Sequence, residues 1–252
     1  MHSFQGKIIV ITGAAGGLGS AMVRAFSSAG GSVVIADVER GAAEILARSV
    51  GDTAVPMTLD VTHESDWEVT LDRVENELGG LDVLVNNAGY FQPNIPFEDM
   101  PFALWRRHFA VNADGTFLGC KHAIRRMKPR GHGAIVNIAS GMALSPRASA
   151  SAYCASKAAV LMTTRTAAAA AGPFGIRVNA VLPGAVPTAM LMGNLVPGQT
   201  EQSLVRDLAQ RGALGRLATP DEIAQAVLFL ADSDNGAITG IALPVDGGNL
   251  VG

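Results

Sequence analysis

Short runs rich in β-branched residues alternate with helical patterns along the entire chain. The strand-like runs cover residues 8–12, 32–36, 54–58, 81–85, 134–138, 177–181 and 241–245. The helical patterns lie between them, at residues 18–28, 41–49, 64–78, 102–127, 152–171 and 221–231. The strand-like runs are almost continuously apolar, as strands are when helices cover both faces of a parallel sheet. The alternation therefore predicts an α/β fold, a single doubly wound parallel sheet of seven strands with helices on both faces.

The composition is that of a packed globular domain. The 252 residues are 48% hydrophobic and 16% charged, with a mean hydropathy of +0.28, which excludes a disordered chain. No linker rich in proline or serine, no block of charge and no internal repeat divides the sequence. We therefore expect a single domain over residues 1–252.

The charge and the cysteine content restrict the possible binding partners and the cellular compartment of the protein. The 19 basic and 22 acidic residues give a formal net charge of -3, which provides no attraction to nucleic acid or to an anionic membrane. The uncharged stretch at residues 178–200 has the length of a membrane span, but Pro183, Pro187 and Pro197 interrupt it. We therefore expect it to be a loop-rich segment over the surface. Two cysteines exclude a disulfide framework, and the amino terminus lacks the pattern of an export signal. We expect a cytoplasmic protein that binds neither nucleic acid nor a membrane.

The histidines and cysteines do not have the spacing of metal ligands. We therefore expect no metal site. His108 and His122 belong to the helical pattern at residues 102–127, and we expect both on helix surfaces.

A glycine-rich turn connects the first strand to the first helix. The run Thr-Gly-Ala-Ala-Gly-Gly-Leu-Gly occupies residues 12–19, directly after the apolar residues 8–11. Glycines at positions 13, 17 and 19 allow a tight turn and a close approach of the backbone to a pyrophosphate, which the amides and the dipole of a helix N-terminus stabilise. Strand, glycine turn and helix in this order are typical of a dinucleotide-binding Rossmann fold.

A carboxylate follows the second strand at the distance that such a fold needs. Asp37 comes 18 residues after Gly19 and can accept hydrogen bonds from the ribose hydroxyls of the adenosine. It would also repel a phosphate on that ribose. Because no Arg or Lys lies in residues 13–19 to pair with such a phosphate, we predict NAD rather than NADP as the cofactor.

Tyr153 and Lys157 are four residues apart, which places them on one face of a helix. An ammonium about 4 Å from a phenol contributes about 4 kcal/mol at an effective dielectric constant of 20. We therefore expect Lys157 to lower the pKa of Tyr153, by about three units, so that the phenol can act as a base near neutrality. Ser140 follows the strand at residues 134–138 and is expected at the carboxyl edge of the sheet, where such sheets bind ligands.

These motifs, in this order, resemble those of the short-chain dehydrogenase/reductase family, and the resemblance covers essentially the whole chain. It implies a catalytic set of Ser140, Tyr153, Lys157 and Asn112. Tyr153 would be the acid/base of a hydride transfer, Ser140 would polarise the substrate oxygen, Lys157 would hold the nicotinamide ribose, and Asn112 would hold a water that links the lysine to solvent.

The resemblance also implies the cofactor site. Asp60 and Val61 match the pair beside the adenine ring, the segment at residues 86–89 supports the central sheet with Asn87 touching the cofactor, and residues 183–188 match the stretch that binds the carboxamide. The implied cofactor-binding residues are Gly13, Gly17, Leu18, Gly19, Asp37, Asp60, Val61, Asn87, Gly89, Tyr153, Lys157, Pro183, Gly184, Val186 and Thr188. The chain departs from the family pattern at Pro187 and in the alanines of residues 167–171, which bear on the carboxamide loop and on subunit packing.

On the substrate side, the resemblance implies contacts from Ser140, Met142, Tyr153 and Met190, with a substrate lid around residues 185–212. Adaptable apolar side chains of this kind favour a hydrophobic secondary alcohol or ketone. An amphipathic turn packed on the domain explains Met190 equally well. Arg147 is the nearest charged residue in sequence and could meet a carboxylate at the pocket mouth, although we expect it in solvent.

Two other functions fit the same fold. One is carbonyl reduction in a biosynthetic pathway, such as that of a 3-oxoacyl thioester, against which Asp37 argues because such reductases usually take NADP. The other is a non-enzymatic dinucleotide sensor, against which the intact catalytic set argues. The family resemblance further implies a homotetramer, in which the helices at residues 102–127 and 152–171 pack across two-fold axes.

Overall fold

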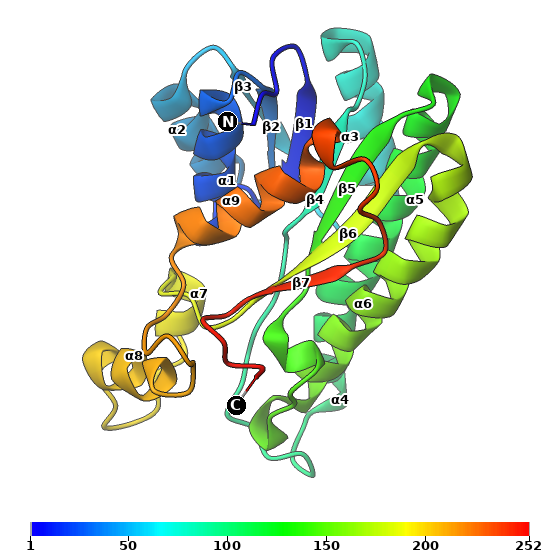
Figure 1. Ribbon diagram of the computed structural model, residues 1–252. Helices are drawn as coiled ribbons and strands as arrows, with labels where there is room; N and C mark the ends of the chain where they lie inside the picture. Colours follow the sequence, from blue (N-terminus) through cyan, green and yellow to red (C-terminus); the bar gives the residue numbers. More distant parts are fainter. Residues whose placement is uncertain (1, 252) are drawn as a thin grey trace.

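The computed structural model describes residues 2–251, and these form the predicted seven-stranded parallel sheet (Figure 1). Met1 and Gly252, which belong to the predicted domain, lie outside the described residues. The order across the sheet is β3-β2-β1-β4-β5-β6-β7. The strands are β1 (Ile8–Thr12), β2 (Ser32–Asp37), β3 (Ala54–Thr58), β4 (Val83–Asn86), β5 (Gly133–Ile138), β6 (Ile176–Pro183) and β7 (Ala242–Val245). The predicted doubly wound α/β fold is confirmed.

Helices cover both faces of the sheet (Figure 1). One layer contains α1 (Gly17–Ser28), α2 (Arg40–Val50) and α9 (Pro220–Ala231). The other contains α3 (Glu64–Arg73), α5 (Gly115–Met127) and α6 (Ser151–Ala171). Three further helices, α4 (Phe102–His108), α7 (Ala189–Met192) and α8 (Glu201–Ala209), lie toward the end of the molecule to which the arrowheads of β6 and β7 point.

Alternate residues of the central strands contribute to two separate cores. Ile9 and Ile11 of β1 are fully buried on the side of α1 and α9, where Phe26 and Val227 lie. Ile8 and Val10 point to the other face, into the cluster that contains Trp67 of α3 and residues of α5. This two-sided burial explains why the strand runs are apolar throughout rather than alternating with polar residues.

Two of the predicted helices are not regular along their length. The helix predicted at residues 102–127 contains a π-helical segment, Phe109–Asp114, between α4 and α5. The helix predicted at residues 64–78 ends in another, Val74–Leu78. A π-helical turn accommodates an extra residue within a helix and re-aims the side chains around it. Asn112, one of the predicted catalytic residues, lies in the first of these segments.

The uncharged stretch at residues 178–200 is divided between two environments. Residues 178–183 form the buried end of β6, so the expectation of a surface position is wrong for them. Pro183 ends that strand, and the following residues lead into α7 on the surface. No helix within residues 2–251 is long and apolar enough to cross a membrane.

The strand order creates a crevice at one edge of the sheet. The chain leaves β1 for α1 on one face, whereas β4, the neighbour of β1, leads to α4 and α5 on the other. In open α/β sheets, ligands bind at the carboxyl ends of the strands where the order reverses in this way. The glycine turn after β1 lies at this point.

Candidate active site

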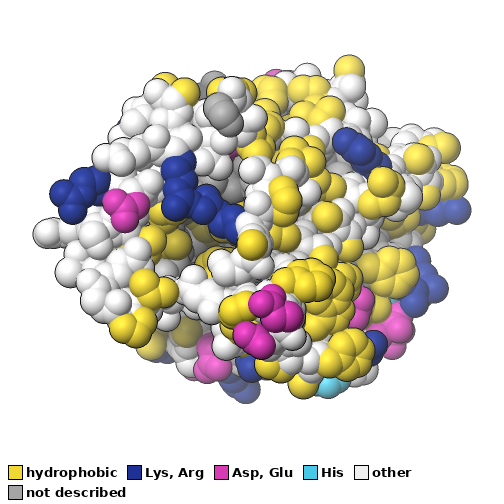
Figure 2. Space-filling model, turned by 90° about the horizontal axis from the view of Figure 1, so that it is seen from below, with side chains coloured by type: hydrophobic (Ala, Val, Ile, Leu, Met, Phe, Trp, Pro, Cys, Tyr) yellow, Lys and Arg dark blue, Asp and Glu magenta, His cyan; other side chains and the backbone are white. Residues whose placement is uncertain are grey.

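A cavity of about 920 Å³ runs along the carboxyl ends of the strands. Figure 2 views the molecule from this end and shows a hollow bordered by hydrophobic and by Lys or Arg side chains. All the predicted cofactor-binding and substrate-binding residues line this cavity: Gly13, Gly17, Leu18, Gly19, Asp37, Asp60, Val61, Asn87, Gly89, Ser140, Met142, Tyr153, Lys157, Pro183, Gly184, Val186, Thr188 and Met190. Residues from five strand ends and the segment after β6 therefore meet in one space.

The glycine turn leaves the N-terminus of α1 open toward the cavity. Gly13 has a φ of +58°, and a Cβ at this position would lie 2.8 Å from the Cα of Ala88, so no larger residue fits without a backbone shift. Gly16 at the N-cap offers no side chain, and the first turn of α1 contains no acidic residue. The amides in the first turn of α1 therefore face no carboxylate from that turn and can bind an anion such as a pyrophosphate.

Asn87 supports the glycine turn from the neighbouring strand. Its side-chain amide donates hydrogen bonds to the carbonyls of Thr12 and Gly13, both at 2.9 Å. The hydroxyl of Thr12 accepts from the backbone amides of Asn87 and Ala88, both at 3.0 Å. The sequence suggested Asn87 as a cofactor contact and gave no role to Thr12. In the folded chain both residues hold β1 and β4 in register at the cavity wall.

Asp37 is likewise tied to the backbone around it. One carboxylate oxygen accepts from the amide of Ala15 at 2.9 Å, and the other accepts from the amide of Glu39 at 3.0 Å. The side chain is buried, yet it lines the cavity at the end of β2. Its charge is thus fixed at the point where the sequence pattern predicts the adenosine ribose.

Ser140, Tyr153 and Lys157 converge on the other half of the cavity. The Ser140 hydroxyl accepts from the amide of Met142 at 3.1 Å and lies close enough to Tyr153 to act on the pKa of the phenol. The Tyr153 ring packs edge-to-face against Phe91, with ring centroids 4.6 Å apart. The ammonium of Lys157 donates to the carbonyl of Ile138 at 2.7 Å and lies 5.9 Å from the centroid of the Tyr153 ring.

Burial dominates the ionisation of this pair. It raises the pKa of Tyr153 to about 12, against which the Ser140 hydroxyl acts only in part. It lowers the pKa of Lys157 to about 8. The expectation that Lys157 lowers the pKa of Tyr153 is therefore wrong. The effect of burial is the largest one on the phenol, and the ammonium donates to the Ile138 carbonyl.

Asn112 lies behind the cavity wall rather than in it. Its side chain is fully buried, donates to the carbonyl of Tyr90 at 3.0 Å and to the hydroxyl of Ser156 at 2.9 Å, and accepts from the amide of Tyr90 at 2.7 Å. A Cβ on Gly89 would lie 3.5 Å from the Asn112 Oδ1 and 3.7 Å from the Lys157 Nζ. Asn112 therefore fixes the loop after β4 close to Lys157.

Several charged or polar residues near the cavity have positions that the sequence did not indicate. His108, expected on a helix surface, is fully buried, with its Nδ1 2.9 Å from the Leu104 carbonyl and its ring against Tyr90. Arg107 lies over the Tyr90 ring at 4.3 Å and lines the cavity. Arg147, expected in solvent, is half-buried in the cavity lining. The run of basic residues at 106–108 was the available signal for Arg107.

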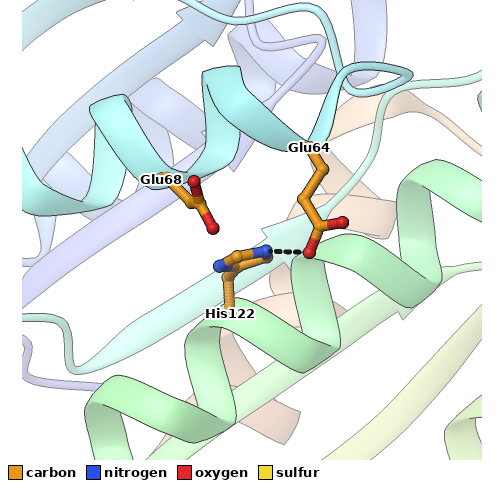
Figure 3. A group of neighbouring side chains, drawn as sticks. All are labelled: Glu64, Glu68 and His122. Carbon is orange, nitrogen blue, oxygen red and sulfur yellow. Dashed lines mark hydrogen bonds and ion pairs between the residues drawn. The ribbon is translucent and has the colours of Figure 1, made fainter.

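His122 is also buried and belongs to a separate cluster with Glu64 and Glu68 (Figure 3). Its Nε2 lies 2.9 Å from a Glu64 carboxylate oxygen, which the Lys121 ammonium also approaches, at 2.5 Å. These hydrogen bonds, that of Lys121 first, hold the pKa of Glu64 below its ordinary value. The buried position corrects the expectation for His122, which serves as a partner for Glu64 on the adjacent helix.

Comparisons with known proteins agree with this geometry. A family model described as enoyl-(acyl carrier protein) reductase matches residues 13–249. The cis-4-hydroxycyclohexanecarboxylate dehydrogenase of Sinomonas cyclohexanicum is 40% identical over 249 residues, which are 98% of either chain. The 2,5-dichloro-2,5-cyclohexadiene-1,4-diol dehydrogenase of Sphingobium indicum is 37% identical over 254 residues, 100% of this chain and 99% of that protein.

A solved structure has the same fold over its whole length. The 3-ketoacyl-(acyl-carrier-protein) reductase from Brucella melitensis, complexed with NADH, superimposes with a TM-score of 0.92 at 32% identity, covering 98% of this chain and 100% of that one. The family resemblance inferred from the motifs is confirmed. The chain belongs to the short-chain dehydrogenase/reductase family of oxidoreductases.

Proposed function

We propose that this protein is an NAD-dependent dehydrogenase that interconverts a secondary alcohol with an apolar body and the corresponding ketone. The observation that carries the proposal is the common cavity that joins the open N-terminus of α1 to Ser140, Tyr153 and Lys157. A dinucleotide bound at the first would extend toward the second. The dehydrogenases of cyclic alcohols among the relatives support the reaction class.

The residues present fit a nicotinamide cofactor. The uncapped first turn of α1 and the glycine turn before it suit the pyrophosphate, and Asp37 suits an adenosine ribose without a 2′-phosphate. We propose that Asp60 and Val61 border the adenine and that the residues from Pro183 to Thr188 border the carboxamide. When bound, the nicotinamide accepts or supplies the hydride. The choice of NAD over NADP rests on the charge of Asp37 at this position.

Tyr153 exchanges the proton of the substrate oxygen. In the reductive direction its phenol donates to the carbonyl oxygen as the alcohol forms, and in the oxidative direction it removes the hydroxyl proton. The raised pKa of Tyr153 keeps the phenol protonated in the free protein, ready to act as a donor. Ser140, whose hydroxyl acts on the pKa of Tyr153, would hold the substrate oxygen beside it.

Lys157 and Asn112 act through Tyr153 and the loop after β4. We propose that the Lys157 ammonium holds the nicotinamide ribose and that its charge favours the phenolate during oxidation. Asn112 would connect Lys157 to solvent, and its bonds to Tyr90 and Ser156 keep the π-helical segment beside the lysine.

Apolar side chains beside Tyr153 define the substrate body. Phe91, Met142 and Met190 line this half of the cavity and suit a non-polar ring or chain. We propose that residues 185–212, which include α7 and α8, form a lid over it, because Met190 and Leu208 reach the cavity from this segment.

The experiment that tests the proposal compares Tyr153→Phe with wild type. Oxidation of a panel of cyclic secondary alcohols is followed by the absorbance of the reduced cofactor, with NAD and NADP in parallel. We expect NAD to be preferred and turnover to fall about 100- to 10,000-fold in the variant, the contribution of a positioned acid/base. Affinity for NADH, measured by fluorescence titration, should stay within about threefold of wild type, because the change removes one oxygen and no charge.

Tyr90→Phe is the matched control, since Tyr90 is the only other tyrosine and its hydroxyl bonds to Gln92 at 2.6 Å. We expect this variant to retain activity. Retention of most turnover by Tyr153→Phe would remove the tyrosine from its role. Tight NAD binding with no turnover of any alcohol would favour a dinucleotide sensor.

A second candidate is reduction of a 3-oxoacyl thioester, which the matching family model and the Brucella melitensis reductase favour. Oxidation of NADPH or NADH with acetoacetyl thioesters, at a rate above that of the alcohol panel, would select it. We further propose a single domain, a homotetramer and a cytoplasmic location. The two cysteines, both buried and unpaired, are consistent with a reducing compartment.

A further inference from the structure

The two halves of the cavity carry opposite charge. Asp37, Glu39 and Asp60 line the half at the ends of β2 and β3. Around Tyr153 the lining contains the cations of Lys157 and of two arginines, Arg107 and Arg147. Asp246, at the end of β7, also lines the cavity, and its single negative charge, which accepts from the amides of Gly248 and Leu250, both at 2.9 Å, is outnumbered by these cations. The catalytic half therefore favours a ligand with an anionic group.

Arg147 stands at the wall between this cavity and a second hollow of about 320 Å³. It lies six residues before Tyr153, in the turn that leads into α6. Both hollows are lined by Arg147, Met142 and Asn249, and the second also by Arg211. Arg147 and Met142 thus border the same cavity as Tyr153.

Arg147 as a residue is half-buried. Within residues 2–251 it has no ion pair and no hydrogen bond from its side chain. Arg177, which is half-buried as well, donates to four backbone carbonyls, at distances from 2.7 to 3.4 Å. A carboxylate at Arg147 would supply a charged partner that residues 2–251 do not. Arg107 differs, because it is exposed and stacked on the Tyr90 ring.

We propose that the substrate is a hydroxy acid, or the matching keto acid, whose carboxylate is bound by Arg147. The planar fork of one guanidinium matches the two oxygens of one carboxylate. The apolar body of this substrate lies against Phe91, Met142 and Met190, between the carboxylate and the oxygen at Tyr153. This inference rests on the proposed function, because it assumes that the hydroxyl is held at Ser140 and Tyr153. Arg147 is then a specificity-determining residue, and Arg107, which lines the same cavity, adds positive potential.

The test compares an acid with neutral analogues of the same shape. The probes are cis- and trans-4-hydroxycyclohexanecarboxylate, their carboxamides and their methyl esters, each oxidised with NAD. We expect wild type to prefer an acid over its carboxamide by at least about tenfold in kcat/KM. In Arg147→Met, kcat/KM for the acid should fall about 10- to 100-fold, mainly through KM, whereas the value for the carboxamide stays within about threefold. Arg147→Lys should retain part of the preference because it keeps the charge but loses the fork.

Arg24→Met is the matched control, because Arg24 is exposed on α1 and lies outside the lining of both hollows. It should keep the preference of wild type. An equal loss on acid and carboxamide in Arg147→Met, or a wild-type preference for the neutral probes, would overturn the inference and leave the proposed function standing.

A binding measurement tests carboxylate recognition by Arg147 without catalytic turnover. Calorimetry with 4-oxocyclohexanecarboxylate is run on the protein with NAD, for wild type and Arg147→Met. Affinity at least tenfold weaker in the variant supports the inference, and equal affinity or no binding to wild type overturns it. If none of the alcohols is oxidised, the proposed function fails, whereas the calorimetric comparison still tests Arg147.

Discussion

Burial acts in opposite directions on the two ionisable residues of the catalytic set, and in both cases it favours the neutral form. The pKa of Tyr153 is raised to about 12 and that of Lys157 is lowered to about 8, since each charged form loses water that the fold does not replace. The carbonyl of Ile138 solvates the ammonium only in part. The free site therefore holds a protonated phenol and an amine that loses its charge in mildly alkaline solution.

The lowered pKa of Lys157 has a consequence for stability. Between pH 8 and 10.5, the folded and ordinary pKa values, the unfolded chain binds more protons at this residue than the folded chain does. Stability from this group therefore rises with pH through that window and is lost as the pH falls through about 8. The full change is on the order of 3 kcal/mol.

Urea unfolding of the cofactor-free protein at several pH values from about 7 to 10 checks this. The free energy of unfolding of wild type should rise relative to that of Lys157→Met across the window. A difference between the two proteins that does not change with pH would contradict the lowered pKa. Measurements stop below the titration of Tyr153, which would act in the opposite direction.

Sequence reasoning predicted residues that the structure brings together at one cavity, but not all of their contacts. The glycine turn, Asp37, Ser140, Tyr153 and Lys157 were all predicted, because each follows a strand or shares a helix face in a recognisable pattern. The burial of His108 and the direction of the Lys157 ammonium depend on contacts between residues distant in sequence, which no local spacing contains.

At the scale of elements, the start of α9 shows how a local signal fixes a boundary. Thr219 caps the helix by accepting a hydrogen bond from the amide of Glu222 at 3.2 Å. The Glu222 carboxylate in turn accepts from the amide of Thr219 at 2.9 Å. The run Thr-Pro-Asp-Glu predicts this start from sequence alone. The irregular segment Phe109–Asp114 has no such signal, because it arises from packing between helices rather than from residue type.

Thr219→Ala should lower the free energy of unfolding by about 1 kcal/mol. The change removes the side-chain acceptor for a backbone amide at the start of a helix that packs on the sheet. Urea denaturation monitored by circular dichroism measures the change. Thr219→Ser, which keeps the hydroxyl, should stay close to wild type. Unchanged stability of the alanine variant would show that the cap is dispensable.

At the scale of the whole molecule, a doubly wound parallel sheet was predictable because alternating strands and helices can be arranged in few ways. The oligomeric state is harder to predict, because it depends on the side chains exposed on the surface of the folded chain. Apolar side chains remain exposed on the two long helices of one layer, with Phe117 of α5 54% exposed and Met162 of α6 57% exposed. Ala168 and Ala171, part of the alanine run at the end of α6, are buried in the core instead.

We expect these helices to pack between copies of the chain in a homotetramer. Light scattering should give a mass of four times 26.0 kDa, and Met162→Glu should reduce it by placing a charge in the interface. Ile45→Glu on α2, where the side chain is 63% exposed, is the control and should leave the mass unchanged. A monomer at micromolar concentration would refute the expectation.

The double attachment of Asp37 limits how the cofactor preference of this protein can be altered. The same carboxylate that would face the ribose also holds the amide of Ala15, inside the glycine turn, and that of Glu39, ahead of α2. Exchanging it for a neutral residue to admit NADPH would release both backbone segments at once. A redesign for the phosphorylated dinucleotide must therefore supply a new acceptor for the turn together with a new cation, and single substitutions at this position should yield a weaker binder of either form.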